Sequence, residues 1–335
     1  MTKKYHIYGM GNALVDFEIE TSESVLLSAG ISKGVMTLID QQKQDQLFQI
    51  FDQQELPKAC GGSAANTIMG AQRLGSKCFY SCKVADDETG RFYKQDLLGK
   101  GVDSNLAYET FSQGKTGKCL VLITPDADRT MNTFLGITGD IDQKQINEEA
   151  LCDSEYLYIE GYLAGSPIAL EAASKVHQFA KKQGVKTAFS LSDPNIVNFC
   201  RDGLKTIIGD GVDILFCNSD EALAYSEAKT LDDAINTLLA ICSTLVVTEG
   251  KQGSQIVTAN QRIRIDAYPV KAVDTNGAGD LFAGAFLHGI GQGLNLEQAG
   301  QLASFAASKL VTQFGPRLKQ EALEKVKAFA KQLGC

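Results

Sequence analysis

The stretch 273–284 reads VDTNGAGDLFAG and places three small residues, Gly277, Ala278 and Gly279, directly before a helical pattern. Small residues let a ligand approach the backbone, and the first turn of a helix offers unpaired N–H groups and a positive dipole end. We therefore predict that the amides of these three residues hold an anion, such as a phosphoryl group in transfer. Asp280 follows at the predicted helix start, where a carboxylate either caps the helix or takes a proton from a nearby hydroxyl.

The spacing of this stretch excludes two other phosphate-binding patterns. A dinucleotide-binding G-x-G-x-x-G would need a glycine at position 282, where the chain has Phe282. The nearest match to a P-loop, GAQRLGSK at 70–77, has Ser76 and Lys77 in the reverse order and at a helix end.

Short apolar runs alternate with amphipathic segments along most of the chain. The apolar runs predict strands at 5–8, 77–84, 156–159, 186–191, 214–218 and 245–248. The amphipathic segments predict helices at 64–74, 90–100, 167–183, 230–240, 281–291, 296–313 and 319–333. This alternation predicts an α/β fold with a central, mainly parallel sheet.

Two regions interrupt the alternation and predict a small separate sheet. Residues 13–21 and 35–39 read as strands without a crossover helix, and so do 119–124 and 130–135, joined by the turn-like PDADR at 125–129. Short turns suggest antiparallel pairing, and we interpret the two regions as one lid; two unrelated edge hairpins are the alternative. We expect a large nucleotide- and substrate-binding domain of residues 1–12, 42–108 and 138–335, and a small lid domain of residues 13–41 and 109–137.

The composition restricts the ligands and the compartment. The 335 residues carry 32 Lys and Arg against 40 Asp and Glu, a formal net charge of −8, which argues against nucleic-acid binding by phosphate neutralisation. No run approaches the ~20 apolar residues of a membrane span, and the opening MTKKYHIYGMGN is too polar for a secretory signal. With no C-x-x-C pair and no H-E-x-x-H, a structural zinc site is not expected. We expect a cytoplasmic protein with neither a membrane nor a nucleic-acid partner.

Five elements of the chain resemble, in order, signatures of the ribokinase-like family, the PfkB-type carbohydrate and nucleoside kinases. The stretch 273–284 is similar to its C-terminal D-T-N-G-A-G-D-x-F-x-x-G signature, and GGSAAN at 61–66 to its N-terminal G-G-x-x-x-N element. The others are GMGNALVD at 9–16, NSDE at 218–221 and TEGKQG at 248–253. The resemblance implies a three-layer α/β/α sandwich with a mainly parallel central sheet and a small β-sheet lid.

Within this family, the order of elements is most similar to the adenosine kinases. The shared features include TGKC at 116–119, an arginine before a lid strand at Arg129, EGY at 160–162 and SDP at 192–194. The resemblance implies ATP-dependent transfer of a phosphoryl group to the primary (5′) hydroxyl of adenosine, giving AMP and ADP.

In the implied reaction, Asp280 is the general base and the amides of Gly277, Ala278 and Gly279 are the anion hole. Two alternatives stay open: a sugar kinase of the same family acting on ribose, fructose or a related sugar, and a non-catalytic relative that only binds its ligand. The expected partners are a nucleoside or sugar and ATP, and the chain is expected to be a monomer or a homodimer.

The side chains expected around a nucleobase are mostly apolar, which favours a nucleoside over a free sugar. They are Leu14, Cys119, Met131, Tyr162 and Leu163. The chain departs from the adenosine kinases here, because those enzymes place a Phe near the position of Leu163 to stack on the base.

The resemblance also implies residues that bind the acceptor. Asp16 would grip the sugar hydroxyls with help from Asn12, since one carboxylate can accept two hydroxyl protons. Gly62, Ser63 and Asn66 would lie against the acceptor at the start of a helix. The alternatives are a solvated lid residue for Asp16 and a helix-capping or exposed position for Asn66.

Arg129 is a lone cation beside acidic and turn residues. Its implied role is closure over the phosphates, where a guanidinium can bind two oxygens. The alternative is a surface ion pair with Asp126 or Asp128.

The nucleotide is expected to lie on later elements of the chain. Asn218 and Glu221 would organise Mg²⁺, mostly through water, because Mg²⁺ keeps much of its hydration shell; a helix cap with a first-turn acid is the alternative. Thr248, Gly250 and Gly253 would contact the nucleotide, with an ordinary turn as the alternative.

The glycines at 277 and 279 would complete the nucleotide-binding set. ATP and Mg²⁺ are the implied cofactors, and K⁺ is a further candidate near Asp274 and Thr275.

Overall fold

The large sheet of the computed structural model, which describes residues 3–51, 58–109, 111–126 and 129–335, has nine strands. In spatial order they are β14 (Arg262–Ile265), β13 (Ser254–Thr258), β12 (Cys242–Thr248), β11 (Val212–Asn218), β10 (Lys186–Ser190), β9 (Ser154–Glu160), β1 (Tyr5–Met10), β5 (Cys78–Ser81) and β6 (Asp103–Ser104). Neighbours from β12 to β6 pair in parallel, and β13 and β14 add an antiparallel edge. The predicted α/β class with a mainly parallel sheet is confirmed.

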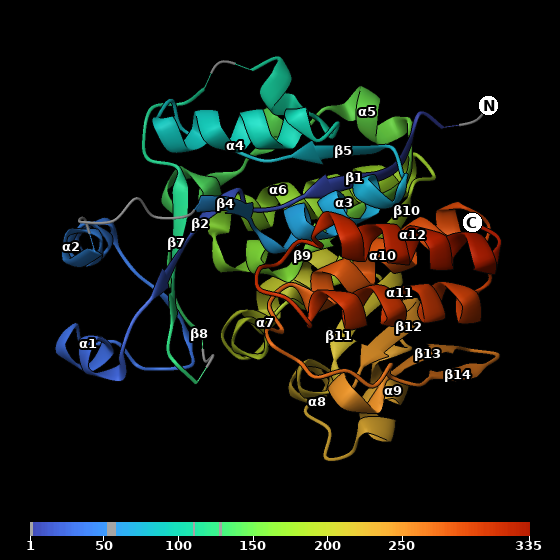
Figure 1. Ribbon diagram of the computed structural model, residues 1–335. Helices are drawn as coiled ribbons and strands as arrows, with labels where there is room; N and C mark the ends of the chain where they lie inside the picture. The colour runs from blue at the N-terminus through green and yellow to red at the C-terminus, as the bar shows by residue number, and fades with distance from the viewer. Residues whose placement is uncertain (1–2, 52–57, 110, 127–128) are drawn as a thin grey trace.

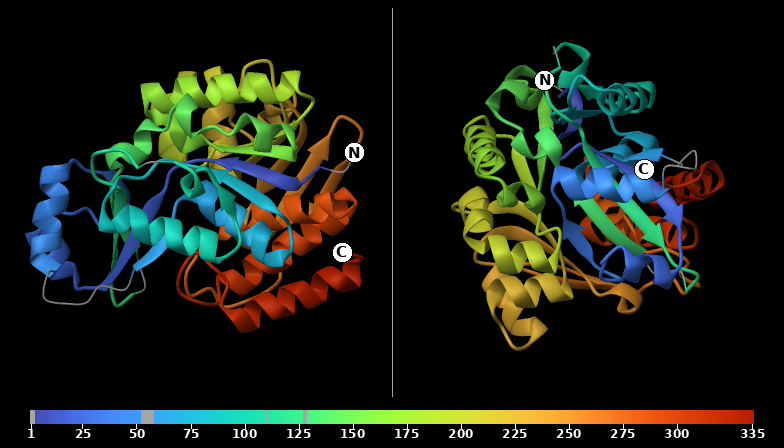
Figure 2. Two further views of the ribbon diagram at one scale, coloured as in Figure 1. Left: turned by 90° about the horizontal axis from the view of Figure 1, so that it is seen from above. Right: turned by 90° about the vertical axis from the view of Figure 1, so that its left-hand side faces the viewer.

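Helices cover both faces of this sheet, because successive strand residues point to opposite sides. Ile7 and Phe216 belong to one hydrophobic core, whereas Tyr8 and Leu215 belong to the other. The first core includes α3 (Ser63–Leu74), α4 (Glu88–Gly99), α10 (Ala278–Gly291), α11 (Leu296–Leu310) and α12 (Gln320–Leu333). The second includes α5 (Glu148–Cys152), α6 (Pro167–Lys182), α7 (Pro194–Ile208), α8 (Ser219–Ser226) and α9 (Leu231–Leu238). The three layers are visible in Figure 2 (left), with the sheet between them.

A second, small sheet stands beside the large one (Figure 1). Its strand order is β3 (Met36–Leu38), β8 (Arg129–Phe134), β7 (Gly117–Ile123), β2 (Leu14–Glu20) and β4 (Lys58–Gly61). The predicted pairing of the two regions is confirmed, since Asp16 lies opposite Cys119 and Met36 opposite Met131.

The expected antiparallel arrangement is wrong, because the small sheet is mixed. β2 and β7 run parallel, as do β3 and β8, and the other two pairs are antiparallel. The Thr138 hydroxyl donates to the Ala13 carbonyl (3.0 Å) and accepts from the Gly117 amide (3.2 Å). The starts of β2 and β7 are therefore held side by side where both strands leave the large domain. Two strands that start together and extend the same way pair in parallel.

The expected lid boundary at residues 41 and 42 is also corrected. β4 and α2 (Gln41–Phe51) were placed in the large domain, but β4 pairs with β2, and Leu47 of α2 packs on Leu120 and Leu122. α1 (Glu23–Ser28) contributes Leu26 to the same hydrophobic cluster, so that α1 and α2 together cover the outer face of the small sheet. The physical reason is twofold. The apolar outer face of the small sheet has to be shielded from water, which α1 and α2 do. The backbone groups at the edge of β2 need hydrogen-bond partners, which β4 supplies.

The helices of the described segments include none that is long and apolar enough to cross a membrane.

Candidate active site

The site lies where the parallel strands of the large sheet end. Ligands of open α/β sheets bind outside the carboxyl ends of the strands. β1 leads into Asn12, β9 ends at Glu160, and β11 and β12 end at Asn218 and Thr248, which lie opposite each other in register. The predicted substrate and nucleotide residues are therefore brought to one edge.

The small-residue turn at 277–279 forms the start of α10, three residues earlier than predicted. Gly277 is the N-cap with a φ of +73°, and a Cβ there would lie 2.8 Å from the Cβ of Pro316. The Ala278 amide donates to the Thr275 carbonyl (3.2 Å). Among the described residues, the amides of Gly277, Gly279 and Asp280 have no acceptor. The open amides therefore differ from the predicted set, because the turn uses the amide of Ala278 and leaves that of Asp280 free.

Asp280 stands in the first turn of α10 and faces the start of α3. Its Oδ1 accepts from Ser63 Oγ (2.7 Å) and its Oδ2 from Asn66 Nδ2 (3.2 Å). The two helices pack closely because Gly284 has no side chain: a Cβ would lie 2.3 Å from the Thr67 carbonyl oxygen. Burial raises the pKa of Asp280 to about 6, although the two hydrogen bonds oppose the shift. A carboxylate with such a pKa can accept a proton at neutral pH.

The turn at Gly61 and Gly62 brings α3 against the link between β1 and β2. Gly62 is the N-cap of α3 with a φ of +97°, and a Cβ would lie 2.2 Å from the Asn12 carbonyl oxygen. At Gly61 a Cβ would lie 2.3 Å from Oδ2 of Asp16. Only glycine therefore allows Asp16 and Asn12 to lie so near the start of α3.

Three buried side chains on these segments have oxygen acceptors that are not used. Asn12 Oδ1 and Asn66 Oδ1 have no hydrogen-bond partner in the described part of the chain, and neither has the carboxylate of Asp16. Burial raises the pKa of Asp16 to about 7, against the lowering effect of Arg317. Buried acceptors without partners are unfavourable, so this end of the site is suited to a ligand with several hydroxyl donors.

Glu160, at the end of β9, was missing from the predicted site residues. Its Oε1 accepts from the Asn12 amide (2.8 Å) and its Oε2 from the Ala64 amide (2.6 Å). Burial raises its pKa to about 7, and these two bonds oppose the shift. Glu160 thus links the end of β1 to the start of α3. The sequence feature that could have identified it is a carboxylate directly after the predicted buried strand at 156–159.

Replacing Glu160 by Gln should lower the free energy of unfolding by about 1–3 kcal/mol, because the new NH₂ group faces a backbone N–H that then has no acceptor. Chemical denaturation at pH 8 measures the difference. Glu155→Gln, on the same strand, is the control and should change stability much less. Equal stability of wild type and Glu160→Gln would show that these bonds are not needed.

Arg129, at the start of β8, contacts the segment that leads to the predicted anion hole. Its Nη2 lies 2.7 Å from Oδ2 of Asp274, and its Nη1 lies 3.4 Å from Oε1 of Glu18. Of the two alternative partners, Asp126 pairs with Lys33, and Asp128 lies outside the described residues. The small sheet thereby places a guanidinium beside Asp274, shortly before the predicted anion hole at Gly277.

Asn218 and Glu221 form a capping box at the start of α8. Glu221 Oε2 accepts from the Asn218 amide (3.0 Å), and Asn218 Oδ1 accepts from the Glu221 amide (2.8 Å). Burial raises the pKa of Glu221 to about 7. In the described segments, no three His, Cys, Asp or Glu side chains are grouped as a metal cage. One carboxylate with spare lone pairs fits Mg²⁺ held mainly by water and phosphate.

Thr248, Gly250 and Gly253 lie around the β12–β13 turn. Thr248 neighbours Asn218 across the sheet, and a Cβ on Gly250 would meet nothing within 4 Å. A Cβ on Gly253 would lie 2.0 Å from the Ile265 carbonyl oxygen, so β14 fills that space. Packing against β14 explains this glycine, and contacts of Thr248 and Gly250 with a nucleotide stay a prediction.

Comparison with known proteins gives a family and two kinds of relative. The model of the pfkB family carbohydrate kinases matches residues 33–323. An adenosine kinase of Saccharomyces cerevisiae is 27% identical over 94% of this chain and 97% of its own length. The structure of an adenosine kinase from Sinorhizobium meliloti has a TM-score of 0.88 at 33% identity, covering 97% of this chain and 99% of that one. A probable sugar kinase from Rhizobium etli has a TM-score of 0.89 at 32% identity, covering 98% and 99%. The ribokinase-like form of the fold is thereby confirmed.

Proposed function

We propose, since this chain belongs to the pfkB family of carbohydrate kinases, that it transfers the γ-phosphoryl group of ATP to the 5′ hydroxyl of adenosine. An ATP-dependent kinase with an alcohol acceptor is what the family establishes, and adenosine is our proposal for the acceptor. The observation that carries it is the placement of Asp280 between open backbone amides and the unused acceptors of Asn12, Asp16 and Asn66.

In this mechanism, the residues at the α3 and β2 starts hold the sugar of the acceptor. Asp16 and Asn12 accept the protons of its ring hydroxyls, and Asn66 orients the primary hydroxyl toward Asp280. Asp280 takes the hydroxyl proton as the oxygen forms a bond to the γ-phosphorus and the bond to the ADP oxygen breaks.

Charge stabilisation is the second half of the mechanism. The amides of Gly277, Gly279 and Asp280, with the N-terminus of α10, face the phosphoryl oxygens as negative charge spreads over them. Arg129 is placed to neutralise the same oxygens after leaving Asp274. Mg²⁺, held near Asn218 and Glu221, would supply charge neutralisation on the nucleotide.

K⁺ stays a prediction and no step depends on it. The Asp274 carboxylate accepts from the amides of Asn276 (3.0 Å) and Gly315 (2.8 Å) and pairs with Arg129, so its oxygens are already engaged.

An apolar surface beside these groups supports a nucleoside over a free sugar. On the inner face of the small sheet, Cys119 is opposite Asp16, and Val121 is opposite Met131. Such side chains suit the face of a purine and offer little to further sugar hydroxyls. A sugar kinase is the second candidate, because a structure of that description is as similar to this chain as an adenosine kinase is.

An ATP-consumption panel with adenosine, other nucleosides, ribose and fructose tests the proposal. We expect turnover with adenosine and formation of AMP, and no consumption with the Asp280→Asn protein. Turnover with a free sugar and none with adenosine would overturn the nucleoside assignment.

The activity should fall on the acid side of neutrality. The pKa of Asp280 is about 6 and that of Asp16 about 7, and both must be charged to accept protons, so kcat/KM should drop as the pH falls from 8 to 5. Ser63→Ala removes a hydrogen bond that lowers the pKa of Asp280, so the fall should begin at higher pH. Ser28→Ala, in α1, is the control. A profile that Ser63→Ala leaves unmoved would argue against titration of Asp280.

A further inference from the structure

The connection between β10 and α7 contains a strained residue at the carboxyl edge of the large sheet. Ser192 has a φ of +72°, and the Asp193 amide donates across it to the Leu191 carbonyl (2.9 Å). A hydrogen bond over one residue with positive φ is the form of the γ-turn that is rare and strained. Among the residues that the structure describes, Glu227 is the other non-glycine residue with a positive φ. Such strain beside a ligand site suggests a local function.

The side chain of Ser192 joins the ends of two neighbouring strands. Its Oγ accepts from the Gly161 amide (2.8 Å) and donates to the Ser190 carbonyl (3.4 Å). Gly161 directly follows β9, and a Cβ there would lie 2.8 Å from the carbonyl oxygens of both Ser190 and Leu191. The turn therefore holds the end of β10 tightly against the residue that follows Glu160.

Glu160 carries this contact to the acceptor side of the site. Its carboxylate is fully buried and accepts from the amides of Asn12 (2.8 Å) and Ala64 (2.6 Å). The space around it is narrow, because a Cβ on Gly11 would lie 2.7 Å from its Oε2. A shift of the backbone at Gly161 would therefore change both hydrogen bonds.

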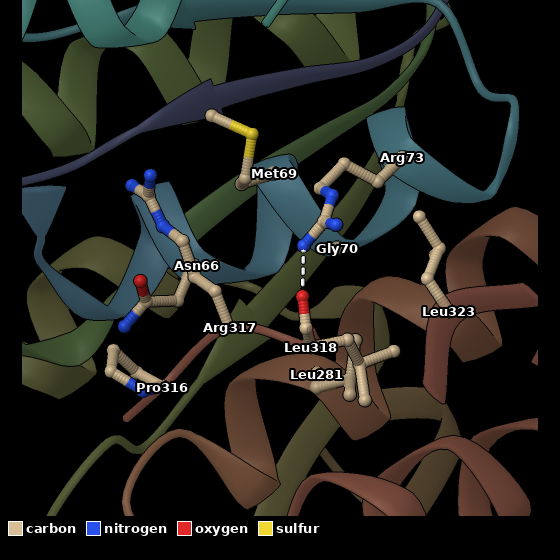
Figure 3. Close-up of a pocket in the computed structure, with 9 residues that line it drawn as sticks. All are labelled: Asn66, Met69, Gly70, Arg73, Leu281, Pro316, Arg317, Leu318 and Leu323. Carbon is tan, nitrogen blue, oxygen red and sulfur yellow. Dashed lines mark hydrogen bonds between the residues drawn. The ribbon is translucent and has the colours of Figure 1, made fainter. Parts of the chain in front are cut away.

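The start of α3 is where Glu160 acts on the proposed base. Ser63, the first residue of α3, donates to Oδ1 of Asp280 (2.7 Å). Farther along, Met69 of α3 and Leu281 of α10 border a small cavity of about 10 Å³ (Figure 3). Because packing leaves this gap between the two helices, hydrogen bonds at the start of α3 help to fix where Ser63 lies.

We propose that Ser192 is a positioning residue for the acceptor side of the site. The strained turn places its hydroxyl on the Gly161 amide, and this contact holds Glu160 against the two amides from which it accepts. The inference rests on the proposed phosphoryl transfer, since it concerns the alignment of Asp280 with the acceptor. Ser192 acts through Glu160 rather than on the reacting atoms.

Three substitutions separate the hydroxyl from the strain. Ser192→Gly removes both, because glycine adopts a positive φ freely, whereas Ser192→Ala removes the hydroxyl and keeps the strain. Ser192→Asn keeps an oxygen that can accept from the Gly161 amide, on a residue that tolerates a positive φ. Each variant is compared in melting temperature and in steady-state kinetics with the acceptor that the ATP-consumption panel identifies.

Activity should follow the hydroxyl, and stability should follow the strain. We expect kcat to fall about tenfold in both Ser192→Gly and Ser192→Ala, with the acceptor KM raised about threefold and the ATP KM within about twofold. The melting temperature should fall in Ser192→Ala but stay within about 2 °C in Ser192→Gly, where relief of strain offsets the lost hydrogen bond. Ser192→Asn should regain most of kcat. A kcat that falls only in Ser192→Ala, in step with its melting temperature, would overturn the proposal and leave a purely structural role.

Glu227→Gly is the matched control. Glu227 follows α8 with a φ of +57°, is exposed and pairs with Arg201 at the surface. Glycine relieves the strain there, and a surface ion pair contributes little, so the melting temperature should not fall and kcat should stay within about twofold. A loss of kcat equal to that of Ser192→Gly would overturn the assignment, because relief of strain at either turn would then lower the rate.

The amide proton resonances of Asn12 and Ala64 give a readout without turnover. Both amides donate to Glu160, and the resonances should move upfield in Ser192→Gly and Ser192→Ala as these hydrogen bonds weaken. Unmoved resonances would overturn the proposal, whatever the acceptor proves to be. Failure of the wild-type protein to phosphorylate any nucleoside would instead overturn the proposed function, so the two failures can be told apart.

Discussion

Replacing Asp280 by Asn is expected to lower kcat by about 10²–10⁴-fold, because the amide cannot take the proton of the attacking hydroxyl. The acceptor KM should change much less, since Asn12, Asp16 and Asn66 still face the sugar. The substitution keeps the size of the side chain, and an amide oxygen can still accept from Ser63. Initial rates of ADP formation at saturating ATP and acceptor measure the effect.

Asp266→Asn is the control for Asp280→Asn. Asp266 is an exposed residue between β14 and α10, and its replacement should leave kcat within about twofold. An Asp280→Asn protein with near-normal turnover would remove Asp280 from the role of general base. The anion hole would then have to work without a neighbouring proton acceptor.

The second large effect should come from Gly277→Ala, with kcat reduced about 10²–10³-fold, as for loss of an anion-hole donor. The φ of +73° is unfavourable for alanine, and its Cβ would lie 2.8 Å from Pro316, so the turn has to shift its amides. Steady-state rates, with the melting temperature recorded in parallel, separate lost catalysis from lost stability.

Gly293→Ala is the matched control, because Gly293 also has a positive φ, +89°, but a Cβ there would meet nothing within 4 Å. It should bear a similar backbone penalty and keep its turnover. Similar kcat values for Gly277→Ala and Gly293→Ala would mean that the turn does not set the rate.

Many strands and helices of the large domain could be predicted from the sequence, because the patterns that indicate them lie within short stretches of the chain. Buried parallel strands such as β11 appear as uninterrupted apolar runs, and helices such as α10 follow small-residue turns. The residues that we propose to bind the acceptor and to act as base were also named from the sequence, and the folded chain brings Ser63 and Asn66 into contact with Asp280.

Features that depend on contacts distant in the chain could not be predicted. The parallel pairing of β2 with β7 follows from Thr138, far from either strand in sequence, and the place of β4 follows from the open edge of β2. The role of Glu160 rests on two backbone amides that only the folded chain brings to it. Arg317 follows no motif, and its ion-pair partner Asp96 comes from α4.

The short joint between β4 and α3 links the two sheets mechanically. β4 ends at Gly61 and α3 begins at Ser63, so a single residue, Gly62, separates the edge of the small sheet from the side chain that holds Asp280. Any displacement of β4 would therefore reach the first residue of α3 through Gly62 alone. Because Ser63 donates to Asp280, such a displacement would also change a hydrogen bond that sets the position of that carboxylate.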